Sequence, residues 1–179
     1  LLKESTKLMT AGVWSLQPEE KSAVLAKFPD ATFSRLFEIL GLTNSELADE
    51  AVFKARIVVQ GSNVRDGYGD SVYFADTSSA PTNMAAIRSL VAFGELTGGS
   101  SQADAEAAYI QPLLPKEVNL YVSIPHSLLT EEMKKKQAHM NNPVYRLLRP
   151  LYGWSRSGNI WEKHLAETLQ NLDTKYEQE

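Results

Sequence analysis

The chain has 179 residues, of which 43% are hydrophobic and 22% charged, a composition typical of one soluble globular domain. Its net charge of −4 and its lack of cysteine argue against strong autonomous nucleic-acid binding and exclude disulfides, thiolate zinc sites and cysteine nucleophiles. No apolar run is long enough to cross a membrane, and the charged first residues do not form a signal peptide, so we expect an intracellular protein without a membrane partner.

The first thirty residues carry the weakest structural signal. A short helix is predicted from Pro18 to Phe28, because proline and the acids Glu19 and Glu20 suit a helix N-terminus. Pro29 ends it. We therefore divide the chain into a poorly defined N-terminal segment, residues 1–30, and one domain, residues 31–179.

Two apolar runs, residues 33–40 and 51–60, predict an antiparallel pair of strands joined by a polar loop. Within the second run, the two-residue period of a strand places Lys54 and Arg56 on the same face. Residues 61–80 are rich in Gly, Ser, Asn and Asp, which indicates a long loop.

The rest of the chain alternates between helical and strand-like patterns. A helix is predicted from Met84 to about Gly94, capped by Thr82 or Asn83 and ended by Gly98 and Gly99. Further along we expect a short strand around Asp104, strands at 117–124 and 144–148, a helical insert at 128–138 and a helix over 160–172. The fold class predicted is α+β: an antiparallel sheet with packed helices.

Three sequence blocks carry a family resemblance: Phe53-Lys-Ala-Arg-Ile-Val-Val-Gln-Gly61, Gln102-Ala-Asp-Ala-Glu-Ala-Ala-Tyr-Ile110, and Val144 to Trp154 closed by Trp161. In this order they resemble the reverse transcriptase of copia-type retrotransposons, with its forms K-A-R-L-V-x-Q-G, Q-x-D-V-x-x-A-[FY]-L and L-Y-G-L-x-Q-[SA]-P-x-x-W. The resemblance covers residues 51–172. It implies the fingers and part of the palm of an RNA-directed DNA polymerase.

By this resemblance, Asp104 would be a catalytic metal ligand, and the carbonyl of Ala105 would face a metal. Tyr109 would lie beneath the sugar of the incoming nucleotide. The complete enzyme would use two Mg²⁺ ions, an RNA template, a DNA primer and deoxynucleoside triphosphates. Without the resemblance, Asp104 is equally compatible with a strand-end acid and Tyr109 with a core aromatic.

The resemblance also implies contacts with phosphates. Lys54 and Arg56 would bind the triphosphate, since guanidinium and ammonium groups suit its oxygens; an ordinary solvated strand face is the alternative. Gly153, Trp154 and Arg156 would lie along the template–primer, in a region where basic residues outnumber acidic ones. Trp161 lies on a helical apolar stripe and is expected to pack in the core.

One family element is missing. The family places two further aspartates in an aromatic-x-Asp-Asp hairpin, and this chain contains no Asp-Asp pair. We therefore expect a truncated piece of a polyprotein, with the remainder of that polyprotein as a partner, and no polymerase activity from the chain alone. The alternatives are a non-catalytic relic that binds nucleic acid, and a domesticated protein-interaction module with an uncovered sheet edge.

Overall fold

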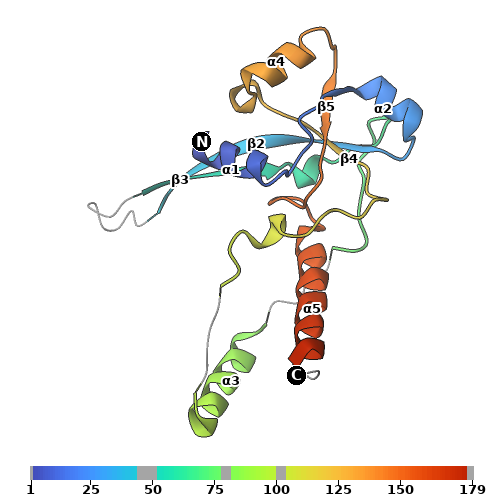
Figure 1. Ribbon diagram of the computed structural model, residues 1–179. Coiled ribbons are helices and arrows are strands. Elements are labelled where there is room, and N and C mark those ends of the chain that lie inside the picture. The colour runs from blue at the N-terminus through green and yellow to red at the C-terminus, as the bar shows by residue number, and fades with distance from the viewer. Residues whose placement is uncertain (1, 44–51, 78–81, 100–103, 177–179) are drawn as a thin grey trace.

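The computed structural model describes residues 2–43, 52–77, 82–99 and 104–176 (Figure 1). The elements follow in chain order: α1 (Leu2–Thr10), β1 (Glu19–Glu20), α2 (Lys21–Lys27), β2 (Thr32–Thr43), β3 (Val52–Val59), η2 (Gly61–Asn63), α3 (Met84–Thr97), η3 (Ala108–Ile110), β4 (Leu120–Ser123), η4 (His126–Leu128), α4 (Glu131–Gln137), β5 (Pro143–Arg146) and α5 (Ser157–Tyr176). The α+β class is as predicted. None of these helices has the length and apolar character needed to span a membrane.

The five strands form one sheet in the order β1-β5-β4-β2-β3. The predicted pair β2 and β3 is antiparallel, with Leu36 opposite Val59 and Thr43 opposite Val52. The prediction of an antiparallel sheet is wrong in one place, because β2 pairs with β4 in parallel. A parallel pair needs a long crossover connection. The connection from β2 to β4 passes through β3 and then through residues 60–119.

The strand predicted around Asp104 is absent from the described residues, 104 onward, and its earlier part lies outside them. The described residues from Asp104 onward form a turn and the short helix η3. Ala107 has φ 53°, a left-handed conformation that a strand does not accommodate. After this turn, the guanidinium of Arg149 donates to the carbonyls of Ile110 and Gln111.

The N-terminal segment contributes residues to the main core. Leu8, Val13 and Trp14 are each at most 2% exposed. Trp14 forms a bridge with Leu147, and the amide of Ser15 donates to the carbonyl of Arg146 at 2.9 Å. Polar residues interrupt the apolar stripe of α1, which is why the sequence signal was weak. Glu19 and Glu20 begin β1 rather than a helix.

The main core lies where α1, the sheet and the start of α5 meet, and a smaller cluster under α2 contains Val24, Phe33 and Tyr121. The predicted helix α3 is present, and the side chain of Asn83 caps it by accepting from the amide of Ala86 at 2.8 Å. Figure 1 shows α3 set apart from the sheet. Apart from Gly94, every residue of α3 is exposed.

Candidate functional site

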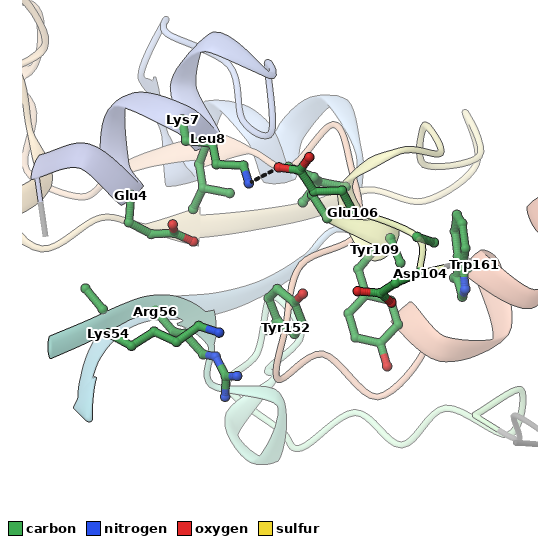
Figure 2. Close-up of a pocket in the computed structure, with 15 residues that line it drawn as sticks. Glu4, Lys7, Leu8, Lys54, Arg56, Asp104, Glu106, Tyr109, Tyr152 and Trp161 are labelled. Carbon is green, nitrogen blue, oxygen red and sulfur yellow. Dashed lines mark hydrogen bonds and ion pairs between the residues drawn. The ribbon is translucent and has the colours of Figure 1, made fainter. Parts of the chain in front are cut away.

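A pocket of about 550 Å³ lies between α1, β3, the segment from Asp104 to Ile110, and the start of α5 (Figure 2). All three sequence blocks contribute to its walls. The lining residues are Glu4, Lys7, Leu8, Lys54, Ala55, Arg56, Asp104, Ala105, Glu106, Ala107, Ala108, Tyr109, Ile110, Tyr152 and Trp161. Five of the eight residues proposed from sequence therefore meet in one place: Lys54, Arg56, Asp104, Ala105 and Tyr109.

Strand β3 supplies the cations of the pocket. Lys54 lies opposite Gly41 and Arg56 opposite Ile39 in the β2–β3 ladder, and both cationic side chains are exposed. Figure 2 shows both extending from β3 along the side of the pocket that leads to Tyr152. Two adjacent exposed cations at the edge of a pocket form a binding surface for an anion.

The segment that contains Asp104 forms the opposite side of the pocket. Asp104 and Ala105 are exposed, whereas Tyr109 is half-buried. The ring of Tyr109 contacts that of Tyr152 edge-to-face, with centroids 5.0 Å apart and planes at 62°. Figure 2 places this aromatic pair between the cations and Asp104. The pair therefore places two aromatic rings, set at an angle to each other, in the wall of the pocket.

Helix α1 closes the pocket with an ion pair that sequence reasoning missed. The ammonium of Lys7 lies 3.2 Å from Oε1 of Glu106, and both side chains are substantially exposed. Such a pair contributes little stability by itself, but it links α1 to the Asp104 segment. The two residues are 99 positions apart. Lys7 lies in no recognisable motif and Glu106 occupies a variable position of the second block, so no sequence signal indicates the contact.

Two glycines, Gly61 and Gly153, allow the backbones of the first and third sequence blocks to pack in direct contact. A Cβ on Gly61 would lie within 3.0 Å of the carbonyl oxygen of Gly153, and a Cβ on Gly153 would lie within 3.0 Å of the carbonyl oxygen of Val59. Gly153 also has φ 87°, a conformation that favours glycine. Next to this contact, the amide of Val59 donates to the carbonyl of Tyr152 at 2.8 Å. The backbone at Gly153 is thus closely packed against the chain itself.

Trp154 and Arg156 lie outside the pocket. Trp154 is 3% exposed and packs edge-to-face on Phe74, so its ring is buried in this structure, and its contact with template–primer stays a prediction. Arg156 lies over the rings of Phe74 and Trp154 and 3.8 Å from Asp76. Trp161, expected in the core, is half-buried and lines the pocket.

The residues described do not fit the two magnesium ions that the resemblance implies. Glu4, Asp104 and Glu106 line the pocket, but Glu106 is paired with Lys7. Among the described residues, no group of three or more His, Cys, Asp or Glu side chains is arranged to hold a metal ion. Two ions a few ångströms apart need several converging carboxylates. The described lining combines the cations Lys54 and Arg56 with the aromatic pair of Tyr109 and Tyr152.

No protein-family model matches the chain, and neither a curated protein nor a solved structure is significantly similar to it. The function must therefore be argued from the sequence blocks and from the pocket in which they meet.

Proposed function

We propose that this chain is the fingers and part of the palm of a copia-type reverse transcriptase, whose parent activity is RNA-directed DNA synthesis. The proposed activity of the chain itself is the binding of a deoxynucleoside triphosphate. One observation carries the proposal: three sequence blocks, separated from one another by residues 62–101 and 111–143, line a single pocket of about 550 Å³. The sequence resemblance rests on these blocks, and nothing in their order along the chain requires them to meet.

The pocket suggests a role for each side. Arg56 and Lys54 bind the triphosphate oxygens, with the guanidinium making paired hydrogen bonds. The surface formed by Tyr109 and Tyr152 supports the sugar and base. Asp104 would supply one metal-binding carboxylate of the complete enzyme. Since a single converging aspartate does not hold two ions, the chain alone binds nucleotide without extending a primer.

The test is a calorimetric titration of the whole chain with dTTP. Loss of hydrogen bonds to a charged phosphate costs about 1.5–3 kcal/mol, so Arg56→Ala should weaken binding at least tenfold. Arg88→Ala is the matched control, because Arg88 is an exposed arginine on α3, away from the pocket. Equal affinities for the two variants would reject the assignment of the pocket. Primer extension by the purified chain would reject the claim that it is inactive alone.

A second function is favoured by the lack of a converging carboxylate group in the described part of the chain. In this second function, the protein is a non-catalytic module that binds an RNA–DNA hybrid through its basic residues. Its affinity would then fall steeply with salt, because binding releases counterions from the backbone. Hybrid binding that is insensitive to salt, or no hybrid binding at all, would exclude this second function.

A further inference from the structure

Helix α3 is apolar on nearly every side, yet it covers nothing in the described structure. Its sequence is MAAIRSLVAFGELT. Met84, Ile87, Leu90 and Val91 are between 42% and 69% exposed. A helix with apolar residues on all sides is normally buried, and an isolated helix of this length is marginal in water. Helix α3 therefore needs a covering surface.

The two charged residues of α3, Arg88 and Glu95, indicate which charges a surface that covers this helix should carry. Arg88 and Glu95 are seven residues apart, which places them on the same side of the helix and separates them by about 10 Å along its axis, too far to pair with each other. Neither has an ion-pair or hydrogen-bond partner among the described residues. A complementary surface presents an acid opposite Arg88 and a base opposite Glu95, at the same spacing.

Helix α3 itself has this charge pattern when its direction is reversed. We propose that α3 pairs with α3 of a second copy of the chain in an antiparallel arrangement, with the two-fold axis between Val91 and Ala92. Arg88 of each copy then lies at the level of Glu95 of the other, so the symmetry produces the ion pair twice. A symmetric parallel pair would instead set like charges at the same level.

The face next to these charges suits close packing. Ile87, Val91 and Gly94 lie at i, i+4 and i+7 and share one side of the helix. This face lies apart from the nucleotide pocket, which α3 does not line. The proposed dimer therefore does not depend on the proposed function.

The test is the sedimentation velocity of the full chain over a concentration series. The wild-type chain should show a reversible monomer–dimer equilibrium. Arg88→Glu and Glu95→Arg each replace two attractive pairs by two repulsive ones, so each should weaken dimerisation about tenfold. The double exchange should restore the wild-type affinity. Lys116→Glu and Glu117→Arg are matched controls, because these exposed residues undergo the same charge changes away from α3.

A second pair of variants separates loss of the interface from loss of the helix. Val91→Asp should abolish the dimer, whereas Phe93→Asp should leave it largely intact. Residues two apart lie on roughly opposite sides of the helix, and both substitutions lower helix propensity equally. A chain that stays monomeric at all concentrations would overturn the proposal. So would a dimer that survives Val91→Asp, which would point to the exposed β2–β3 hairpin around Phe53, 82% exposed.

Discussion

Replacement of Gly61 by alanine should destabilise the protein by about 3 kcal/mol. The new methyl group would lie within 3.0 Å of the carbonyl oxygen of Gly153, and that obstacle is backbone rather than a flexible side chain. To relieve the clash, the start of η2 and the Gly153 turn must separate. This separation stretches the 2.8 Å hydrogen bond between Val59 and Tyr152 beyond hydrogen-bonding range.

The magnitude follows from the groups that lose their partners. A broken hydrogen bond that leaves buried donors and acceptors unsatisfied costs about 1–3 kcal/mol. Val59 and Leu151 are at most 1% exposed, and loosening their packing adds about 1 kcal/mol. For a chain of this size, a total of about 3 kcal/mol lowers the melting temperature by roughly 6–12 °C. Thermal and urea unfolding, followed by circular dichroism, measure both quantities.

A matched control separates the clash from the general effect of losing a glycine. Gly69 has φ 93° but nothing within 4 Å of its Cβ position. Gly69→Ala therefore imposes only the strain of a left-handed backbone, about 1–2 kcal/mol. Gly153→Ala combines both costs and should be the most destabilising of the three variants. The reasoning is refuted if Gly61→Ala costs no more than Gly69→Ala.

Two further predictions concern stability alone. Burial raises the pKa of Tyr121 and of Tyr145 above the ordinary 10.0. The stability that the neutral phenols contribute is complete below pH 10.0 and is lost as the pH rises through the pKa values of the folded state. The urea midpoint should therefore fall as the pH is raised above 10.0. Tyr145→Phe should reduce the fall, and an unchanged pH profile would contradict this. The carboxylate of Glu20 accepts from two backbone amides of the turn before β5, at 2.9 and 3.0 Å. Glu20→Ala should therefore cost about 1–2 kcal/mol in urea unfolding, while Glu19→Ala, without those bonds, should cost less.

The predictions that the structure confirms came from patterns between residues that are close together in the chain. The period of two in β3 placed Lys54 and Arg56 together at the pocket. The cap at Asn83 fixed the start of α3, because a cap is a contact between neighbours in sequence. Where a strand was expected around Asp104, the described residues instead turn at Ala107, which has φ 53°.

By itself, the sequence determined which face each element presents, and through its three blocks it suggested which residues belong to one site. Only the tertiary structure decided which faces meet. It set the Lys7–Glu106 ion pair, the backbone contact of Gly61 with Gly153 and the burial of Trp154. The period of apolar residues indicates which side of a single helix or strand is buried. The partner of a buried face depends instead on packing between segments distant in the chain, which no local pattern records.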